Sequence, residues 1–433
     1  MDLITKIESH KAEVAIIGMG YVGFPLAVEF AQAGFNVTGV DLNATKVSVI
    51  SHGGSHIPDV DPEVVSPLVR AGKLKATTDF EVLARADAMS ICVPTPLNKT
   101  KNPDVSFILA ASEQIKLRLR KGQLIVLEST TYPGTTEELI RPMLEDTGLR
   151  AGKDFYLAFS PERVDPGNKT YMIHNTPKVI GACTPECLKH ASAYYSQIVE
   201  KVVEVSSTDA AEMVKLLENT FRAVNIGLVN EVALMCDVLG IDVWEVLEAA
   251  ASKPFGYMPF KPGPGLGGHC IPIDPHYLSW KLKSLNYYAR FIELAGEINS
   301  SMPAYVVRKV TDALNDCRRS VKGSRILILG VTYKKDIDDV RESPALDVVR
   351  LLQRKGGKVA FTDPFVQEFK MNGGLLASRE LTPELVAGVH CVVVTTDHSS
   401  FDYRMVLENA SLIVDTRDAF GARGLRSDKI VKL

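Results

Sequence analysis

One cysteine stands in a segment whose composition would suit a nucleophile. The segment GPGLGGHCIPID, from Gly263 to Asp274, places Cys270 behind a run rich in glycine. A glycine-rich loop exposes its backbone to a substrate, and its amides lower the pKa of a thiol, which favours the nucleophilic thiolate. A lone cysteine is otherwise a small buried hydrophobic residue. We expect that of the others, Cys92, Cys183, Cys187, Cys236, Cys317 and Cys391.

Polar residues near this cysteine and on a predicted helix could assist it. Asp274 precedes Pro275, the pattern of a helix N-cap followed by proline at the first helical position. Capping and catalysis could coexist at Asp274. Lys215 and Asn219 are spaced to share one face of a helix. From the residues alone, a solvated surface pair explains them as well as a functional pair.

A second glycine-rich segment predicts a dinucleotide site. GMGYVG follows an apolar run, with Gly18 for the tight turn, Gly20 for approach of a pyrophosphate and Gly23 for helix packing. Asp41 closes the next apolar run about 20 residues on, where an acid can accept both ribose hydroxyls and would repel a 2′-phosphate. The pattern favours NAD over NADP, and a glycine-rich turn without a ligand is the alternative.

Short apolar runs alternate with amphipathic stretches at both ends of the chain, which is typical of doubly wound α/β domains. Gly330 follows one of the later runs without further glycines in phase, so we expect the last domain to hold something other than a dinucleotide. The expected strands lie at 12–18, 34–41, 86–96, 123–130 and 154–162, and again at 324–334, 356–364, 390–398 and 411–417.

The middle of the chain is predicted to be helical. The stretch 207–240 has apolar residues at three- and four-residue spacing and predicts one helix of more than about 25 residues. A capping signal at Thr208-Asp209 with Glu212 opens it, and Gly240 closes it. Further helix is expected over 242–252 and 277–315, with a break near Pro303 in the second stretch.

Composition excludes several classes of protein. The 433 residues carry a net charge of −3, which suggests neither a nucleic-acid nor a membrane partner. The first residues lack the pattern of a signal peptide, and no run approaches the roughly 18 apolar residues of a membrane span. With 7 cysteines and no CxxC pair, neither a disulfide framework nor a metal site is expected. We expect a cytoplasmic location, from the absence of these signals and from the predicted use of NAD.

Taken together and in order, the motifs resemble the UDP-glucose/GDP-mannose dehydrogenase family over nearly the whole chain. They are GMGYVG, EST, SPER, KLLEN, GGHCIPID and YKKDIDDVRES. His269 and Ile273 replace residues usual in the UDP-glucose branch, so the cysteine loop is similar to the branch acting on UDP-N-acetylhexosamines. It is most similar to UDP-N-acetylglucosamine 6-dehydrogenases of bacterial polysaccharide pathways, such as O-antigen synthesis.

The resemblance implies an α/β fold with two Rossmann-like doubly wound domains joined by a helical central region with one long helix. We expect an NAD-binding domain over 1–205 and a central helical domain with the cysteine loop over 206–318. A UDP-sugar-binding α/β domain would cover 319–433. The central helix would serve a homodimer or a higher homo-oligomer.

The resemblance also implies a four-electron oxidation of the sugar C6 alcohol to an acid, with NAD as oxidant. Cys270 would attack the C6 aldehyde, and the thiohemiacetal would be oxidised to a thioester that water hydrolyses. Lys215 would stabilise the oxyanion, Asn219 would help to hold it, and Asp274 would position water or move a proton. Thr130 and Glu162 would complete the proton network.

Binding residues carried over from the family divide into two groups. The cofactor side comprises Gly18, Gly20, Tyr21, Val22, Gly23, Asp41, Thr95, Thr130 and Arg341. The substrate side comprises Glu162, Arg163, Lys215, Asn219, Gly267, Lys334 and Arg417, with no metal. Whether Asp165 takes the part of a second acidic residue of the UDP-glucose branch stays open.

Other functions fit parts of the sequence. Epimeric substrates, UDP-N-acetylmannosamine or UDP-N-acetylgalactosamine, and UDP-glucose remain alternatives, because motifs do not report sugar configuration. A two-electron dehydrogenase of the 6-phosphogluconate type would need neither the cysteine nor a second α/β domain. A catalytically inactive sensor of NAD and nucleotide sugar would not need the family's catalytic positions, which are filled here.

Overall fold

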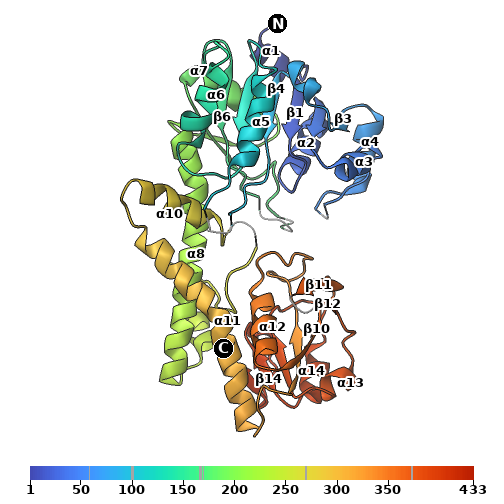
Figure 1. Ribbon diagram of the computed structural model, residues 1–433, viewed down its shortest axis with the longest axis vertical. Coiled ribbons are helices and arrows are strands. Elements are labelled where there is room, and N and C mark those ends of the chain that lie inside the picture. Colours follow the sequence, from blue (N-terminus) through green and yellow to red (C-terminus); the bar gives the residue numbers. More distant parts are fainter. Residues whose placement is uncertain (58, 99–101, 165–167, 169, 269–270, 372–373) are drawn as a thin grey trace. The chain divides into compact units, whose positions relative to one another are not determined.

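A computed structural model describes residues 1–57, 59–98, 102–164, 168, 170–268, 271–371 and 374–433. The chain forms two compact units (Figure 1). The first comprises Met1–Glu218 with His276–Tyr287, and the second comprises Asn219–Pro275 with Tyr288–Leu433. The three-domain division at 205/206 and 318/319 stays a prediction.

The first unit is built on a sheet with strand order β3-β2-β1-β4-β5-β6-β7-β8. All neighbouring strands pair in parallel except β6 and β7. The sequence predicted five of these strands and missed β3, β7 and β8. The strands are β1 (Glu13–Ile17), β2 (Asn36–Val40), β3 (Leu74–Thr77), β4 (Ala88–Ile91), β5 (Leu124–Leu127), β6 (Tyr156–Phe159), β7 (Lys178–Ala182) and β8 (Val202–Glu204).

Both faces of this sheet are covered, which explains why its strands read as continuous apolar runs. Alternate residues of β1 point to opposite faces: Val14 packs in the cluster of Phe30, and Ala15 packs in the cluster of Ile108. The helical elements of the unit are α1 (Leu3–Glu8), α2 (Gly23–Gln32), α3 (Ala44–Ser51), α4 (Pro62–Arg70), η1 (Phe80–Ala84), α5 (Ser106–Lys116), η2 (Thr135–Ile140), α6 (Arg141–Glu145) and α7 (Pro185–Tyr195).

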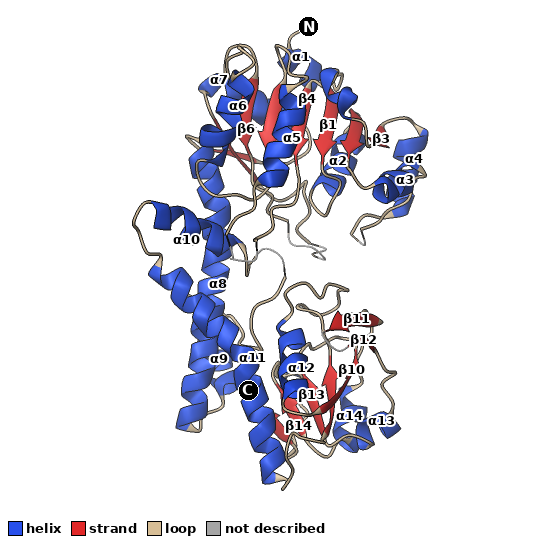
Figure 2. Cartoon of the chain, viewed as in Figure 1, coloured by secondary structure: helices blue, strands red, loops and turns tan. Residues whose placement is uncertain are grey.

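The second unit contains a parallel sheet of the same kind (Figure 2). Its order β10-β9-β13-β14-β15 repeats the inner order β2-β1-β4-β5-β6 of the first sheet, so the predicted pair of Rossmann-like folds is confirmed. The strands are β9 (Arg325–Leu329), β10 (Lys358–Thr362), β13 (Cys391–Val394), β14 (Ile413–Asp415) and β15 (Ile430–Lys432), beside a hairpin of β11 (Glu368–Met371) and β12 (Gly374–Ala377).

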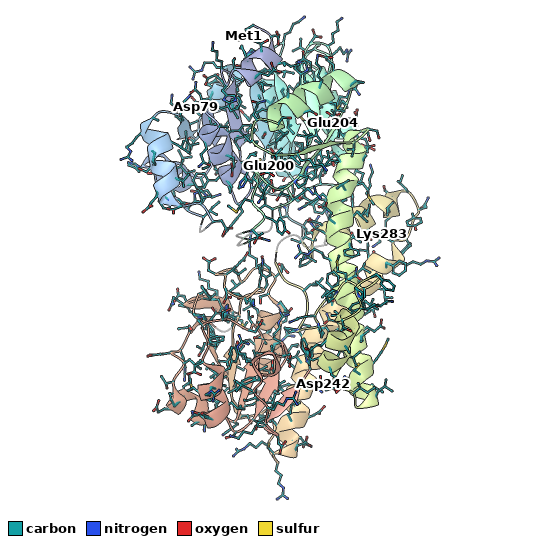
Figure 3. All side chains as sticks on the ribbon, turned by 180° about the vertical axis from the view of Figure 1, so that it is seen from behind. Met1, Asp79, Glu200, Glu204, Asp242 and Lys283 are labelled. Carbon is teal, nitrogen blue, oxygen red and sulfur yellow. The ribbon has the colours of Figure 1, made fainter. Side chains whose placement is uncertain are left out.

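Helices pack on this second sheet. Asp242 (labelled in Figure 3) caps α9 by accepting the N–H of Trp244, and its second oxygen lies 2.6 Å from Nζ of Lys432 on β15. An ion pair thus joins the start of a helix to the last strand. The helical elements that lie wholly in this unit include α9 (Val243–Ala251), α11 (Arg290–Asp316), α12 (Pro344–Arg354), α13 (Pro383–Ala387), α14 (Tyr403–Asn409) and η3 (Gly421–Arg423).

The predicted long helix is α8, Thr208–Leu239, which is confirmed at both ends. Gly240 follows it with φ +70°, the left-handed conformation that ends many helices. The predicted break at Pro303 is wrong, because Pro303 is buried inside the continuous α11. The interruption falls earlier, between Ser284, which ends α10 (Asp274–Ser284), and the start of α11. Tertiary packing of α11 outweighs the hydrogen bond lost at proline.

The capping signal at the start of α8 is also wrong in detail. Ser207 supplies the cap, with its Oγ accepting the N–H of Ala210 at 3.1 Å. Glu212 instead faces another segment: its carboxylate accepts N–H bonds from Gly134 at 2.7 Å and Thr136 at 3.0 Å, at the start of η2. Burial raises the pKa of Glu212 to about 7, against the lowering effect of these hydrogen bonds.

Within the described residues, no helix is long and apolar enough to cross a membrane. In the same part of the chain, no group of three or more His, Cys, Asp and Glu side chains is placed to hold a metal ion.

The raised pKa of Glu212 predicts a pH-dependent stability. The folded chain binds this proton more tightly than the unfolded chain, whose pKa is near 4.5, so stability falls as pH rises from about 4.5 to about 7. The shift corresponds to about 3 kcal/mol. In thermal melts, Glu212→Gln should no longer show this fall in stability between about pH 4.5 and 7. Glu8→Gln, at an exposed site, should still show it. A pH-independent difference between wild type and Glu212→Gln would contradict the assignment.

Candidate functional site

The glycine turn after β1 has the geometry that the sequence predicted. Gly18 has φ +94°, and a Cβ atom on it would lie 2.6 Å from the carbonyl oxygen of Cys92. A Cβ on Gly23, the first residue of α2, would lie 2.0 Å from the oxygen of Gly18. A Cβ on Gly20 would meet nothing within 4 Å. The turn is therefore closed on the protein side and open at Gly20, as a pyrophosphate at a helix N-terminus requires.

Asp41 lies at the end of β2 beside this turn. Its Oδ2 accepts the N–H of Met19 at 2.9 Å, and its Oδ1 accepts the N–H of Asn43 at 2.8 Å. Its side chain is 12% exposed, with Nζ of Lys46 at 3.5 Å. Asp41 thus fixes the turn and still presents oxygen to the surface, where ribose hydroxyls could donate to it.

The other expected cofactor residues differ in exposure. Tyr21 is 45% exposed, and Val22 stands at the N-cap of α2. Thr95 is buried, and its carbonyl oxygen accepts the hydroxyl of Tyr277 from α10 at 2.8 Å. Thr130 is half-buried after β5. These placements are compatible with a dinucleotide along the strand ends of the first sheet, the usual position in this fold.

A buried ionic network lies in the first unit, and sequence reasoning missed its central residue. Nζ of Lys178, on β7, lies 2.7 Å from Oε2 of Glu128 and 3.3 Å from Oε2 of Glu162. The hydroxyl of Tyr195 donates to the other Glu128 oxygen at 2.6 Å. A lysine in the otherwise apolar strand KVIGA was the signal for it, since a buried charge requires a partner.

This network sets the ionisation of Glu162. Burial alone would raise the pKa of Glu162, but the charge of Lys178 overcomes it and the pKa lies below its ordinary value. The N–H groups of Arg163 and Val164 also donate to Glu162, at 2.8 and 2.7 Å. Nζ of Lys215 donates to the carbonyl oxygen of Glu162 at 2.6 Å. Two predicted catalytic residues therefore meet here, and the acid is ionised.

Arg163, expected on the substrate side, is bonded to the protein in this structure. Its guanidinium pairs with Glu218 on α8 and donates to the carbonyl oxygen of Pro177 at 2.7 Å. These contacts join the SPER segment to α8 one helical turn after Lys215. Arg163 therefore has a structural role in this unit, and its contact with substrate stays a prediction.

The second unit brings together Asn219 and Asp274. Nδ2 of Asn219 donates to Oδ2 of Asp274 at 2.5 Å, and both residues are buried. Asp274 is the first residue of α10, one position later in the helix than an N-cap. The amide fixes the orientation of the carboxylate, which a group that holds water or a proton needs.

The cysteine loop is described up to Gly268 and again from Ile271. Cys270 and His269 lie outside the described residues, as does Asp165. Earlier in the loop, the N–H of Gly263 donates to Oδ1 of Asn230 at 3.0 Å, and a Cβ on Gly263 would lie 2.4 Å from the Arg417 guanidinium.

The remaining binding residues lie on loops of the second unit. Nε of Arg417 donates to the carbonyl oxygen of Thr395 at 3.0 Å, and burial lowers the pKa of Arg417. Arg341, expected near NAD, forms an ion pair with Asp339 at 2.6 Å. Lys334 is half-buried in the loop after β9. Lys334 and Arg417 thus lie in the same unit, and Arg341 is paired with Asp339 in this structure.

Comparison with known proteins adds a family to this geometry. Residues 12–199 match the NAD binding domain of the UDP-glucose/GDP-mannose dehydrogenase family, 209–301 match its central domain, and 327–422 match its UDP binding domain.

Individual relatives match over most of the chain. The UDP-N-acetyl-D-glucosamine 6-dehydrogenase of Pseudomonas aeruginosa is 38% identical over 82% of this chain and 83% of its own. The UDP-N-acetyl-D-mannosamine dehydrogenase of Yersinia pestis is 38% identical over 90% of this chain and 94% of its own. The solved structure of the UDP-D-ManNAc dehydrogenase from Pyrococcus horikoshii matches with TM-score 0.86 at 34% identity, over 94% of this chain and 96% of that one.

The Lys178 network generates a prediction about pH. Lys178→Met should leave Glu162 without its buried cation, raise the pKa of Glu162, and move the acid limb of the turnover pH profile upward by about one unit or more. It should also lower stability by about 3–5 kcal/mol, because two buried carboxylates lose their partner. Lys178→Arg should recover most of both properties.

Lys116→Met is the matched control, since Lys116 pairs with Asp146, which is 70% exposed. Its effect on stability should stay below about 1 kcal/mol. An acid limb that does not move in a folded Lys178→Met protein would show that Lys178 does not set the charge of Glu162.

Proposed function

Since the chain belongs to the UDP-glucose/GDP-mannose dehydrogenase family, we propose that it oxidises UDP-N-acetyl-D-glucosamine at C6 to UDP-N-acetyl-D-glucosaminuronate. As a family member it is an NAD-dependent nucleotide-sugar dehydrogenase. The observation that carries the proposal is the arrangement around Glu162. This acid is ionised by its ion pair with Lys178 and lies beside Lys215, in the unit that also holds the glycine turn. The Pseudomonas aeruginosa relative, a UDP-N-acetyl-D-glucosamine 6-dehydrogenase, supports the choice of sugar.

The first unit fits the cofactor that the family uses. NAD, when bound, would accept one hydride from C6 in each oxidation, so that two NAD would be reduced per sugar. The open backbone at Gly20 and the N-terminus of α2 would hold its pyrophosphate. The exposed edge of Asp41 would accept the ribose hydroxyls and disfavour a 2′-phosphate. Tyr21, Val22, Thr95 and Thr130 would line the same edge.

The chain's own residues would carry the chemistry of the sugar. Lys215 would face the negative charge that develops on the C6 oxygen in both oxidations, and Asn219 would share that task. The thiolate of Cys270 would add to the C6 aldehyde, and the resulting thiohemiacetal would lose a second hydride to become a thioester. Water held by Asp274 would then cleave the thioester, releasing the acid and the thiol. Glu162 would take up protons, and Thr130 would complete the network of water and protons around it.

Sugar configuration is the open choice within this proposal. UDP-N-acetyl-D-mannosamine is the second candidate, because the Yersinia pestis and Pyrococcus horikoshii relatives carry that activity in their names. UDP-N-acetylgalactosamine and UDP-glucose differ at single substituents and complete the panel. The product acid would enter bacterial polysaccharide synthesis such as O-antigen assembly in the cytoplasm. Lys334, Gly267 and Arg417 would bind the nucleotide sugar, and Arg341 would lie near NAD.

The central helices also support a homodimer as part of the proposal. Large apolar side chains are exposed along α8 and α11, among them Phe221 at 45%, Leu228 at 55%, Met235 at 50%, Phe291 at 77% and Leu294 at 53%. Monomers rarely expose such a series on neighbouring turns of long helices. Sedimentation at twice 47.3 kDa would support the dimer, and a monomer at micromolar concentration would exclude it.

The stoichiometry of NADH is the direct test of the reaction. With NAD in excess and the nucleotide sugar limiting, absorbance should show two NADH per UDP-N-acetylglucosamine and little from UDP-glucose. One NADH per sugar would indicate a two-electron dehydrogenase, and none from any of the four sugars would indicate a sensor. Preference for UDP-N-acetylmannosamine would keep the reaction and change the sugar.

Cys270→Ser tests the thioester. The variant should lose at least about a hundredfold in net turnover, because the second oxidation needs a covalent adduct. Cys317→Ser, at an exposed cysteine, is the control and should turn over as wild type. Wild-type rates in Cys270→Ser would contradict the mechanism.

A further inference from the structure

The two units hold the turn after their first strand by the same interaction. In the first unit, the N–H of Met19 donates to Oδ2 of Asp41 at 2.9 Å. In the second, the N–H of Val331 donates to Oδ2 of Asp363 at 2.7 Å. The glycine before each turn residue also donates to the last residue of the second strand, at 2.8 and 2.9 Å. Asp363 therefore occupies the structural position of Asp41.

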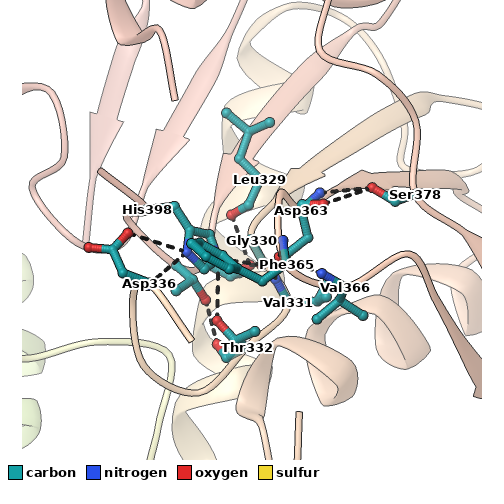
Figure 4. Close-up of polar contacts among 12 residues, drawn as sticks. Leu329, Gly330, Val331, Thr332, Asp336, Asp363, Phe365, Val366, Ser378 and His398 are labelled. Atoms are coloured by element: carbon teal, nitrogen blue, oxygen red, sulfur yellow. Dashed lines mark hydrogen bonds and ion pairs between the residues drawn. The ribbon is translucent and has the colours of Figure 1, made fainter. Parts of the chain in front are cut away.

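The two carboxylates differ in their remaining partners. Asp41 is partly exposed, whereas the side chain of Asp363 is 0% exposed. Oδ1 of Asp363 accepts the N–H groups of Phe365 and Val366, and its Oδ2 also lies 3.0 Å from Nε2 of His398 (Figure 4). Both oxygens of Asp363 are thus occupied by groups of the second unit, whereas Asp41 keeps an exposed edge where ribose hydroxyls could donate. This agrees with the expectation that the last domain holds something other than a dinucleotide.

His398 has a single tautomer that fits its contacts. Its Nδ1 lies 2.9 Å from the backbone nitrogen of Asp336, and an N–H group can only donate, so Nδ1 must accept. The proton then sits on Nε2 and is donated to Asp363, with Oγ1 of Thr332 nearby at 3.3 Å. The imidazole is fully buried, so neither contact can be exchanged for water.

This buried pair holds one loop at both ends. Asp363 binds the first residue of the loop, Val331, and His398 binds the sixth, Asp336. Asp336 has φ +61°, and its carboxylate accepts the N–H and hydroxyl of Ser399 at 2.8 and 2.7 Å. The conformation between them is therefore fixed by contacts that are independent of any ligand.

The middle of that loop supports the segment that leads to the cysteine. A Cβ on Gly267 would lie 2.4 Å from Cβ of Tyr333, and one on Gly268 would lie 2.8 Å from the Tyr333 ring. The N–H of Gly268 also donates to the carbonyl oxygen of Arg341 at 3.0 Å. Gly268 has φ +87°, which favours glycine. Only residues without a side chain can lie this close to Tyr333, and Cys270 follows two residues later.

We propose that His398 and Asp363 are positioning residues for the cysteine loop, acting through Tyr333. They hold the 331–336 loop, Tyr333 seats Gly267 and Gly268, and the same loop carries Lys334 for the nucleotide sugar. One buried pair thus couples occupancy of the nucleotide-sugar site to the placement of Cys270. The proposal rests on the proposed function for the part played by Cys270 and Lys334.

The experiment compares full-length His398→Ala and His398→Gln with wild type. Alanine removes both contacts, and glutamine can donate to Asp363 and accept from Asp336. We expect His398→Ala to bind UDP about tenfold more weakly by calorimetry and to lose about a hundredfold in kcat, because a misplacement near 1 Å has that cost. NAD affinity, a property of the first unit, should stay unchanged, and His398→Gln should recover most of the loss.

A second readout does not depend on turnover. The rate at which iodoacetamide alkylates Cys270, followed by mass spectrometry against the exposed Cys317, should lose its protection by UDP in His398→Ala. Tyr333→Ala should reproduce this loss with both buried anchors intact, and Tyr333→Phe should restore protection because its ring remains. His390→Ala, in the same unit before β13, is the matched control and should behave as wild type.

The outcomes separate the two proposals. A wild type that forms no NADH with any nucleotide sugar would overturn the proposed function, while UDP binding and alkylation would still report on the positioning pair. A folded His398→Ala protein with wild-type UDP affinity, wild-type protection of Cys270 and wild-type kcat would overturn the positioning proposal. If His398→Ala does not fold, the Tyr333 pair decides it: equal protection in Tyr333→Ala and Tyr333→Phe would overturn it.

Discussion

A carboxylate at the end of the second strand ties down the first turn in each α/β unit. Asp41 does this for the glycine turn at Met19, and Asp363 does it for the loop that starts at Val331. A parallel sheet presents the carboxyl ends of its strands along one edge, so a side chain there can reach the neighbouring turn. The predicted contacts of Gly20 with a pyrophosphate and of Lys334 with the nucleotide sugar depend on turns held in this way.

The same interaction leads to different surfaces because the carboxylates meet different neighbours. Asp41 keeps an exposed edge, with Lys46 close by, and can accept further hydrogen bonds. Asp363 is buried under His398 and has none to spare. A single histidine on the loop after β13 thus makes an internal anchor of the position at which ribose binding is predicted in the first unit. The two units therefore share the order of their inner strands and differ in the contacts that surround this carboxylate.

The ionic network around Lys178 shows the complementary constraint on charge. Glu128 and Glu162 are taken out of water, and a buried carboxylate without a cation would bind a proton instead. Lys178 lies between them and Lys215 approaches the backbone of Glu162, so the acid stays ionised within a largely dry site. A carboxylate kept ionised in this way can accept a proton, and its burial keeps bulk water from competing for that role.

The sequence by itself determined the α/β class, the long helix α8, the glycine turn and most buried strands, because apolar periodicity and glycine spacing are local properties of the chain. It also determined the family, through motifs in order. Only the tertiary structure decided the partners of Glu212, the place of the break before α11, and the parts of Lys178 and His398. Those features depend on residues far apart in sequence, and a buried polar group takes the partner that folding brings to it.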